Sequence, residues 1–584
     1  MNRVANEVSD EFRMNSKIPT LTIEDQGMRK YLSVFLCWVT TSLVAQEYAR
    51  DGMVVSASEI ASEVGVAILK DGGNAIDAAV ATAFALAVTW PSAGNIGGGG
   101  FIVYRQHTGE VTTFDFREKA PAAATSTMYL DENGDLVKDL NHLSILAVGV
   151  PGTVAGLYDA HRLYGKLPWA RLVRPAVRLA RKGFSYTYGI YHDAIYHEKR
   201  WKEIPSTAAV MFRDGTTMYQ PGETWRQPDL ARTLARIKRR GKEGFYSGKT
   251  AEKLVSFIQS QGGIMTRLDL AEYEARERMP VTGTYRGYDI YSMAPPSSGG
   301  VTLIQMLNIL EGFNLTAYGY HSAAYVHVVS EAMRRGYANR ALHLGDPDFN
   351  PDMPIEKLIS KEYAATLRNT IVPDTVSVSD PAAFSQPYES PNTTHLSVVD
   401  KEGNAVSLTY TLEYAYGSQI VADGLGFFLN NEMGDFNPIP GVTNDEGLIG
   451  TPPNLIAPGK RMLSSMTPTI LAKDGKLFML IGSPGGRSII GTVLQVILNV
   501  VDHDMDIAMA IESGRFYHQW LPDVIAYEKY SLTDDTLDLL SQIGHRLRQI
   551  RMQGAAMGIV FDADRGVLSG HADSRSPDGG VAGY

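Results

Sequence analysis

NTTHLSVVDKEGNAVSLTYTL, residues 392–412, is the stretch of sequence that decides the fold. Two runs rich in Val, Leu and Thr flank the triplet Lys401-Glu402-Gly403, a pattern that predicts a β-hairpin with a three-residue loop. Gly403 occupies the last position of that loop, where the backbone commonly adopts a positive φ that glycine tolerates without a steric penalty. We therefore expect the chain to be organised around this hairpin.

The loop sets the register of the two strands. With three loop residues, Asp400 pairs with Asn404, and counting back along the strands places Thr393 opposite Thr411. Two hydroxyl groups then meet at the open end of the hairpin, where a nucleophile could be built. Cross-strand threonine pairs are also common in ordinary sheets, so spacing alone favours a structural pair over a catalytic one.

The composition is that of a large globular protein with an acidic surface. The chain has 584 residues, 44% of them hydrophobic and 20% charged, and a formal net charge of −10. This length exceeds one ordinary domain and can bury a large core. The negative charge argues against nucleic acid or an anionic membrane as the main partner.

The N-terminal region reads as a targeting segment. Residues 1–27 are polar without apolar periodicity, and we interpret them as a non-native extension ahead of a start at Met28. Arg29 and Lys30 then precede an uncharged run that ends in small residues, so we predict that 28–45 is a secretory signal peptide. The uncharged run is too short to cross a bilayer comfortably. No membrane span is therefore expected, and the mature protein should be secreted, periplasmic or extracellular.

No residue pattern points to a metal or a cofactor. Cys37, the only cysteine, lies inside the predicted signal peptide, so the mature chain would have no thiol for catalysis, disulfides or zinc. His192, His197 and Glu198 lack the HExxH spacing of a zinc helix. The glycine run 97–100 precedes a strand instead of following one, and no Lys-Ser/Thr pair follows it, so we reject nucleotide binding. Close packing of backbone against backbone is the expected reason for the run.

The first half of the chain predicts helices around a few strands. Residues 74–88 are apolar on nearly every face, as in a buried helix, and 150–280 read as mainly helical. A strand over 111–116 delivers Arg117 and Glu118 to its end. An adjacent Arg and Glu usually form a surface ion pair, but a position next to a buried region leaves anion recognition open.

The segments on either side of the hairpin contain long loops. Several prolines make 371–392 an exposed connector that leads into the hairpin. After the hairpin, 427–436 is predicted to be an apolar strand that ends in polar groups. The Gly/Pro/Asn-rich stretch 441–458 could act as a lid.

A glycine turn between a strand and a helix provides a candidate oxyanion site. The predicted strand 477–481 is followed by Gly482-Ser483-Pro484-Gly485-Gly486 and then by a helix over 487–501. Such a turn leaves the amides of Gly485 and Gly486 unpaired at a helix N-terminus, where they can bind an anion or an oxyanion.

Five of these segments, in collinear order, make the chain resemble the γ-glutamyltranspeptidase family, also called glutathione hydrolases, over about residues 53–584. The resemblance rests on Gly94-Asn95-Ile96-Gly97-Gly98-Gly99-Gly100-Phe101, Phe116-Arg117-Glu118, Thr393-Thr394-His395-Leu396-Ser397, Leu463-Ser464-Ser465-Met466 and Gly482-Ser483-Pro484-Gly485-Gly486. It implies an α+β N-terminal-nucleophile hydrolase, folded as a four-layer αββα sandwich with an additional mainly helical region.

The resemblance also implies a precursor that cuts itself between Asn392 and Thr393. The cut would give a large subunit, 46–392, and a small catalytic subunit, 393–584, which together form a heterodimer. The hydroxyl of Thr393 would attack the γ-glutamyl carbonyl, and its freed α-amino group, whose pKa is far below that of a lysine, would take the proton.

By the same matching, other residues complete the implied site. Thr411, which the hairpin register reached independently, matches the family's second threonine, implied to orient the nucleophile. Gly485 and Gly486 match the oxyanion hole. The α-carboxylate would be held by Arg117, Ser464 and Ser465, and the α-ammonium by Glu413, Glu432 and Asp435. The lid stretch 441–458 has Asp445-Glu446 where the best-known lidded members carry an aromatic residue.

The implied function is that of a self-processing γ-glutamyltransferase and glutathione hydrolase. Its partners would be glutathione and other γ-glutamyl compounds as donors, with water, amino acids or dipeptides as acceptors, and with no cofactor and no nucleic acid. Two alternatives stay open. One is an acylase of the same fold for glutaryl amides such as β-lactam side chains, which the retained carboxylates disfavour. The other is an uncut secreted binding protein, which the intact Thr393–Thr411 pair disfavours.

Overall fold

The computed structural model describes residues 47–380, 393–442, 444 and 450–584. The predicted extension 1–27, the predicted signal peptide 28–45 and Asn392 therefore lie outside the described residues. None of the helices in the described ranges is long and apolar enough to cross a membrane.

Two antiparallel sheets of seven strands each form the centre of the unit that begins at residue 46. In order across the first sheet, the strands are β1 (Glu47–Ala49), β20 (Val567–Ala572), β19 (Met557–Asp562), β15 (Lys476–Gly482), β14 (Thr469–Lys473), β11 (Tyr288–Ser292) and β10 (Val281–Tyr285). The second sheet runs β21 (Gly580–Gly583), β2 (Met53–Ser56), β12 (Thr394–Val399), β13 (Ala405–Thr411), β3 (Gly99–Arg105), β4 (Val111–Asp115) and β9 (Arg276–Arg278).

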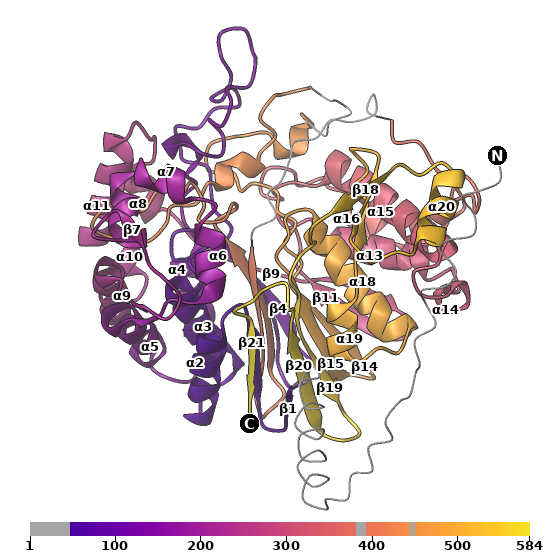
Figure 1. Ribbon diagram of the computed structural model, residues 1–584, viewed down its shortest axis with the longest axis horizontal. Helices are drawn as coiled ribbons and strands as arrows, with labels where there is room; N and C mark the ends of the chain where they lie inside the picture. The colour runs from indigo at the N-terminus through magenta and orange to yellow at the C-terminus, as the bar shows by residue number, and fades with distance from the viewer. Residues whose placement is uncertain (1–46, 381–392, 443, 445–449) are drawn as a thin grey trace, which may run out of the picture. The chain divides into compact units, whose positions relative to one another are not determined.

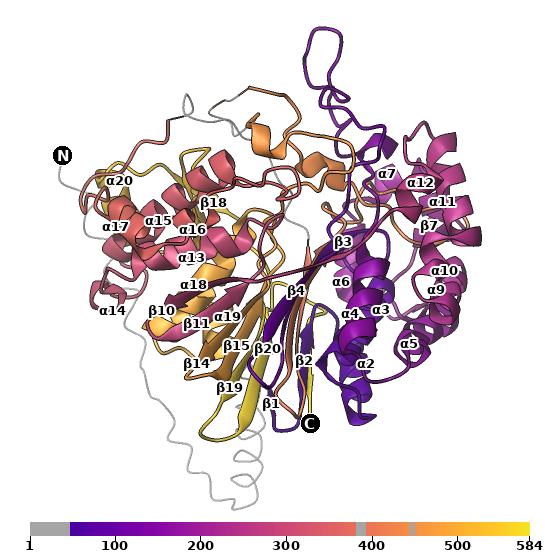
Figure 2. The same cartoon turned by 180° about the vertical axis from the view of Figure 1, so that it is seen from behind.

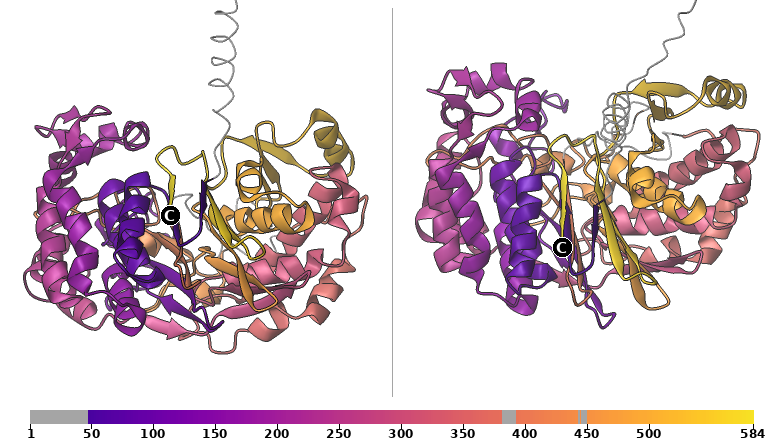
Figure 3. Two further views of the ribbon diagram at one scale, coloured as in Figure 1. Left: turned by 90° about the horizontal axis from the view of Figure 1, so that it is seen from below. Right: turned by 60° about the horizontal axis from the view of Figure 1, so that its bottom comes forward.

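The sheets pack face to face, with β12, β13 and β2 of the second sheet against β15, β19 and β20 of the first. Helices α2 (Glu59–Lys70) and α3 (Ala75–Thr89) cover the outer face of the second sheet, and α13 (Gly299–Leu310), α18 (Ser488–Asp502) and α19 (Ile507–Glu512) cover that of the first (Figures 1 and 3). The order helix, sheet, sheet, helix confirms the predicted four-layer αββα sandwich.

The additional helical region is also present, and Figure 2 shows it on the side of α2 and α3, with most of it outside them. Its helices are α4 (Thr153–Tyr164), α5 (Trp169–Lys182), α6 (Tyr188–Ala194), α7 (Glu198–Lys202), α8 (Pro205–Met211), α9 (Pro228–Arg240), α10 (Glu243–Tyr246), α11 (Gly248–Ser260) and α12 (Arg267–Ala271). Further helices, α14 (Leu315–Tyr318), α15 (Ala323–His343), α16 (Ile355–Leu358), α17 (Lys361–Arg368) and α20 (Asp534–Gln542), lie on the side of the first sheet. As predicted, α3 is buried along its whole length, because α2, α5 and the sheet enclose it.

The predicted hairpin over 392–412 is β12–β13, and its register is the predicted one. Thr394 faces Tyr410, and the same offset holds along the ladder to the last pair. The Asp400 amide donates to the Asn404 carbonyl at 3.0 Å, and Gly403 has a φ of +88°. Thr393 directly precedes β12 and Thr411 ends β13. Every residue of both strands is buried, because the hairpin lies between the first sheet and α3.

The glycine run packs backbone against backbone, as expected. A Cβ added to Gly98 would lie 2.0 Å from the Thr411 carbonyl oxygen, and one on Gly100 would lie 2.4 Å from that of Thr409. Only glycine lets β3 approach β13 this closely. The run therefore places β3 and β4, with Arg117 just beyond β4, beside the end of β13.

The prediction of a strand over 427–436 is wrong. The segment forms one isolated bridge, between Val421 and Phe428, and then the 3-10 turn η3 (Glu432–Asp435). The side chain of Asn430 donates to the carbonyls of Gly97 and Gly149 and accepts from the amides of Gly149 and Glu432. Because a side chain supplies these backbone hydrogen bonds, no strand partner is needed.

Candidate active site

The predicted site residues meet at one cavity between the ends of the sheets. Apart from Gly485 and the undescribed Asn392, all of them line it: Arg117, Thr393, Thr411, Glu413, Glu432, Asp435, Ser464, Ser465 and Gly486. Met466 and Ile489 complete the wall. Gly485 lines a second cavity of about 210 Å³ on the other side of the glycine turn. These residues come from six separate segments, so the fold rather than local sequence assembles them.

The nucleophile candidate lies at the open end of the hairpin. Thr393 is 8% exposed and Thr411 is 2% exposed. The Thr411 hydroxyl accepts a hydrogen bond of 2.8 Å from the amide of Glu413. Glu413 has a φ of +78°, a conformation that non-glycine residues rarely adopt and that is concentrated at functional sites. The strand end is thus bent so that Thr411 and Glu413 both face the cavity.

The turn after β15 has the form of an oxyanion hole. Gly485 and Gly486 have φ values of +138° and +56°, and among the described residues neither amide donates a hydrogen bond to another group. Ser483 braces this turn: its hydroxyl donates to the Pro484 carbonyl at 2.6 Å and accepts from the Ala555 amide at 3.1 Å. Two free amides next to a threonine hydroxyl can stabilise a tetrahedral oxyanion.

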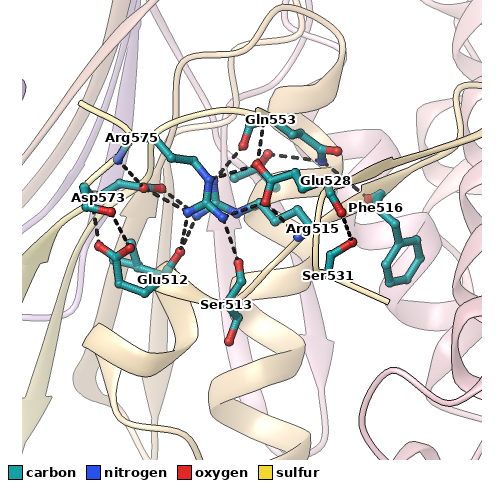
Figure 4. Close-up of polar contacts among 12 residues, drawn as sticks. Glu512, Ser513, Arg515, Phe516, Glu528, Ser531, Gln553, Asp573 and Arg575 are labelled. Carbon is teal, nitrogen blue, oxygen red and sulfur yellow. Dashed lines mark hydrogen bonds and ion pairs between the residues drawn. The ribbon is translucent and has the colours of Figure 1, made fainter. Parts of the chain in front are cut away.

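A buried network of two arginines and three carboxylates holds the chain behind this turn (Figure 4). Arg515 bonds Asp573 at 2.6 Å, and Arg575 bonds Glu528 at 2.6 Å and Asp573 at 3.0 Å. Glu512 accepts from the backbone and side chain of Ser574 at its edge. The two arginines balance Asp573 and Glu528, so these buried ions are compensated, whereas Glu512 at the edge is only partly buried.

This network fixes the backbone that touches the oxyanion turn. Arg515 donates to the Gln553 carbonyl at 2.7 Å, and the Gln553 amide donates to Glu528 at 2.7 Å. The next residue, Gly554, lies against the glycine turn: a Cβ added to Gly485 would lie 3.2 Å from the Gly554 Cα. These residues carry no signal in the sequence, because an arginine is usually a surface residue and its burial depends on partners far along the chain.

Arg117 is a fully buried cation and not one half of a surface pair. Its guanidinium donates to Glu432 through Nη1 and to Asp435 through Nη2, and Nε donates to the Met462 carbonyl at 3.3 Å. The hydroxyl of Tyr273 donates to the Arg117 carbonyl at 2.8 Å, which fixes the backbone beyond β4. The guanidinium therefore faces two of the three predicted ammonium-binding carboxylates.

Burial dominates the protonation of the carboxylates beside Arg117. Desolvation raises the pKa of Glu118 to about 7, although Arg117 opposes the shift. Desolvation also raises the pKa of Glu432 well above its ordinary value, again against the attraction of Arg117. The cavity thus holds one permanent cation and more carboxylates than that cation can neutralise, which suits it to a ligand that carries its own positive charge.

Ser464 and Ser465 are held rigidly on the opposite wall. The Ser464 carbonyl accepts from the Ser298 amide at 2.7 Å, and the Ser464 amide donates to Pro296 at 2.9 Å. Arg340 of α15 donates to the Ser465 hydroxyl at 3.0 Å. The sequence predicted these serines but not the contact with Arg340 that orients Ser465.

One further residue of the site was not predicted. His142, in the loop before α4, makes a hydrogen bond of 3.2 Å through Nδ1 to the Glu413 carboxylate. Its ring stacks on Tyr414 with centroids 4.7 Å apart and planes within 5° of each other. No motif or periodicity marked His142, since its partner lies 271 residues away.

A metal ion has one candidate position among the described residues, away from this cavity. His327, Glu331 and His545 place their ligand atoms within 4.8 Å of one another. Those atoms are already engaged: the two imidazoles bond each other at 2.8 Å, and Glu331 accepts from Arg334 and Arg335. The two arginines also repel a cation, so this cluster serves packing rather than metal binding.

The predicted lid is described only in part. Asp445 and Glu446 lie outside the described residues. At the base of the stretch, the Gly441 amide donates to the Gly450 carbonyl at 2.9 Å, and Asn437 donates from its backbone to Asn454 at 2.9 Å. These bonds join the two ends of the stretch next to η3.

Comparison with known proteins gives a consistent picture. The family model described as Gamma-glutamyltranspeptidase matches residues 61–584. A glutathione hydrolase proenzyme of Pseudomonas sp. (strain A14) is 47% identical, over 85% of this chain and 87% of that protein. The crystal structure of cephalosporin acylase from Bacillus halodurans has a TM-score of 0.81 at 26% identity, over 93% of this chain and 97% of the solved one. The Helicobacter pylori gamma-glutamyltranspeptidase structure is 46% identical with a TM-score of 0.54, over 55% of this chain and 91% of the solved chain.

Proposed function

Because the chain belongs to the gamma-glutamyltranspeptidase family, we propose that it cleaves γ-glutamyl amides, glutathione among them, through a γ-glutamyl ester on Thr393. The chain is an enzyme, a γ-glutamyltransferase and glutathione hydrolase. The observation that carries the residue assignment is the single cavity that joins Thr393 to Arg117, Glu432 and Asp435.

The cavity fits the amino-acid head of a γ-glutamyl group. Arg117 can bind the α-carboxylate with two parallel hydrogen bonds, and Glu413, Glu432 and Asp435 can bind the α-ammonium. In the structure Arg117 pairs with Glu432 and Asp435, so a bound zwitterion would enter between opposite charges and satisfy both. Ser464 and Ser465 would add hydroxyl donors to the carboxylate.

Thr393 supplies the nucleophile and the base once it is the first residue of a chain. An α-amino group has a pKa about 2.5 units below that of a lysine and is partly unprotonated near neutral pH. It would take the hydroxyl proton as the oxygen bonds to the γ-carbonyl carbon, with the oxyanion bound by Gly485 and Gly486. When the amide C–N bond breaks, the same proton passes to the leaving amine. Water or the amine of an amino acid or dipeptide then attacks the ester.

This chemistry requires a cut between Asn392 and Thr393. The products would be a large subunit, 46–392, and a small subunit, 393–584, that stay together as a heterodimer. The strands of the two fragments support this, since β12 and β13 of the small one lie between β2 and β3 of the large one. The Helicobacter pylori match supports it too, because a separate large subunit would cover just over half of this chain.

The predicted signal peptide, 28–45, supports export of the enzyme. We infer a secreted, periplasmic or extracellular location, in which extracellular glutathione would be the available donor.

The cephalosporin acylase structure makes a glutaryl acylase the second candidate, since the two folds are alike along almost the whole chain. A glutaryl group has a terminal carboxylate but no α-ammonium. Glu413, Glu432 and Asp435 would then be buried carboxylates with no cation to bind from the substrate, which is unfavourable. A γ-glutamyl group therefore fits the cavity better than a glutaryl group.

The deciding experiment compares the wild-type protein with Thr393→Ala. The wild type should show two bands on a denaturing gel, the smaller beginning at Thr393, and should release glutamate and cysteinylglycine from glutathione and form γ-glutamyl dipeptide with glycylglycine. Thr393→Ala should stay uncut and inactive. Thr394→Val is the matched control, because the buried Thr394 hydroxyl has no hydrogen-bond partner among the described residues and its removal should be nearly neutral. A processed Thr393→Ala would show that the cut site is misassigned, and release of glutaryl but not γ-glutamyl groups would favour the acylase.

A further inference from the structure

A second layer of protein supports the ammonium side of the cavity. The loop between β4 and α4 packs on the turn η3 through a small hydrophobic cluster separate from the main core. Its members are Ala120, Ala124, Tyr129, Met433, Phe436, Ile456 and Met462. The Tyr129 hydroxyl donates to the Leu146 carbonyl at 3.0 Å and closes this loop on itself. The loop is therefore a fixed part of the site and carries His142 to the back of Glu413.

His142 touches both segments that carry the ammonium-binding carboxylates. Its Nδ1 bonds the Glu413 carboxylate at 3.2 Å, and its ring lies flat on Tyr414. On the other side the ring lies against η3, where a Cβ on Gly434 would be 2.2 Å from Nδ1. Gly434 sits between Glu432 and Asp435 in sequence, so the imidazole is wedged between the end of β13 and the turn η3.

We propose that His142 is a positioning residue that aims Glu413 at the substrate α-ammonium and so sets the preference for γ-glutamyl over glutaryl acyl groups. The inference rests on the proposed function of the same cavity. It adds a residue outside the cavity wall, from the large-subunit segment, that acts on a carboxylate of the small-subunit segment.

The imidazole is suited to this role because it is neutral. Burial lowers the pKa of His142 to about 4, although Asp435 and Asp139 favour the charged form. A neutral ring that donates from Nδ1 orients the carboxylate without adding a positive charge beside the ammonium site. The negative charge of Glu413 is thus left for the ligand. A lysine or arginine at this place would neutralise it.

The hydrogen bond from His142 also restrains Glu413 next to its unusual backbone conformation. With a φ of +78°, this residue is held in an uncommon conformation. The hydrogen bond to His142 holds the Glu413 side chain, and the stack of the His142 ring on Tyr414 holds the residue that follows Glu413. Loss of the bond should therefore change recognition of the ammonium before it changes the nucleophile.

The test separates the hydrogen bond from the ring stack. His142→Phe keeps an aromatic ring on Tyr414 but removes the donor, and His142→Asn keeps a donor at the Nδ1 position but removes the ring. The matched control is His321→Phe, since His321 is also a buried imidazole stacked on a neighbouring tyrosine (Tyr320, centroids 3.8 Å apart) but does not line the cavity.

Steady-state kinetics with γ-glutamyl-p-nitroanilide, with L-glutamate and glutarate as competing inhibitors, give the readout. His142→Phe should raise KM and the Ki of L-glutamate about 10-fold, the lower end expected for a hydrogen bond to a charged group. It should leave kcat, self-processing and the Ki of glutarate within about twofold. His142→Asn should recover part of the loss, and His321→Phe should match the wild type.

Two results would overturn the inference. Equal weakening of L-glutamate and glutarate by His142→Phe would mean a general packing role, and unchanged constants would mean no role. An inactive wild type would instead refute the proposed function, so the two failures are distinguishable.

Discussion

Replacement of Arg117 by lysine should separate substrate recognition from self-processing. Arg117 faces two carboxylates with two edges of one planar group, and in the complex it would present the same fork to the α-carboxylate of the γ-glutamyl head. A lysine keeps the charge but offers a point donor that can bond only one oxygen well. The scissile peptide of the precursor has no such carboxylate, so the cut should not need the fork.

The choice of lysine over alanine follows from burial. Arg117, Glu118 and Glu432 are each 0% exposed. In the described part of the chain Arg117 is the one cation that touches these carboxylates, so its removal would leave uncompensated buried charge, at a cost of about 3–5 kcal/mol. Arg117→Ala would therefore impair folding as well as recognition. Arg117→Lys should lose one charge-assisted hydrogen bond to the substrate, worth about 1.5–3 kcal/mol, which corresponds to about a 10- to 150-fold lower kcat/KM.

Two measurements on one preparation test this. The loss of precursor is followed on a denaturing gel, and kcat/KM is measured on the processed enzyme with γ-glutamyl-p-nitroanilide. The expected result is a 10- to 150-fold fall in kcat/KM, mostly through KM, with a processing half-time within about threefold of the wild type. If processing slows by the same factor as turnover, Arg117 shapes the whole site and the reasoning is refuted.

Three further changes test other parts of the structure. Gly98→Ala should destabilise the protein by about 1–3 kcal/mol and slow processing, because its Cβ would lie 2.0 Å from the Thr411 carbonyl oxygen. The control is Gly491→Ala, whose Cβ would have its nearest neighbour at 3.3 Å and which should leave thermal unfolding unchanged. Burial lowers the pKa of His395 to about 3, so between pH 6.5 and 3 the unfolded state binds a proton that the folded state does not. The free energy of unfolding of the wild type should therefore fall by about 1.4 kcal/mol per pH unit in this range because of His395. In denaturant titrations, His395→Asn should abolish this part of the pH dependence. Asp523 accepts from the Ser379 amide at 2.9 Å, so Asp523→Asn should expose new thermolysin sites near Ser379, detected by the mass of the large fragment; an unchanged digest would contradict this anchor.

Local chemistry explains what the sequence predicted well. The hairpin register depends on a turn of three residues and on the alternation of two strands, both of which are short-range. It therefore reached Thr411 correctly, as the ladder from Thr394 shows. Gly485 and Gly486 were predictable for the same reason, since a strand, a turn and a helix follow one another directly.

Long-range partners explain what the sequence could not predict. Arg117 and Glu432 are 315 residues apart, so residue patterns alone favoured a surface ion pair for Arg117. Asn430 looked like part of an apolar strand, but its side chain takes over the backbone hydrogen bonds of its surroundings. His142 contacts Glu413, which lies 271 residues further along the chain, so no local pattern marked His142.

The cavity combines two tasks whose residues come from different elements. The groups needed for any acyl transfer at Thr393 lie on the β12–β13 hairpin and on the glycine turn before α18. The groups proposed to recognise the amino-acid head lie beyond β4, in η3 and on the segment before β14. Before the cut the nitrogen of Thr393 is an amide and cannot act as a base, and the scissile peptide has no amino-acid head for Arg117 to bind, so we expect self-processing to depend on the hairpin and the glycine turn more than on the head-binding set. After the cut the same hydroxyl gains an amine base, and only then does the head-binding set contribute. Changes at Gly486 should therefore impair both reactions, whereas changes at Arg117 or His142 should impair turnover and spare the cut.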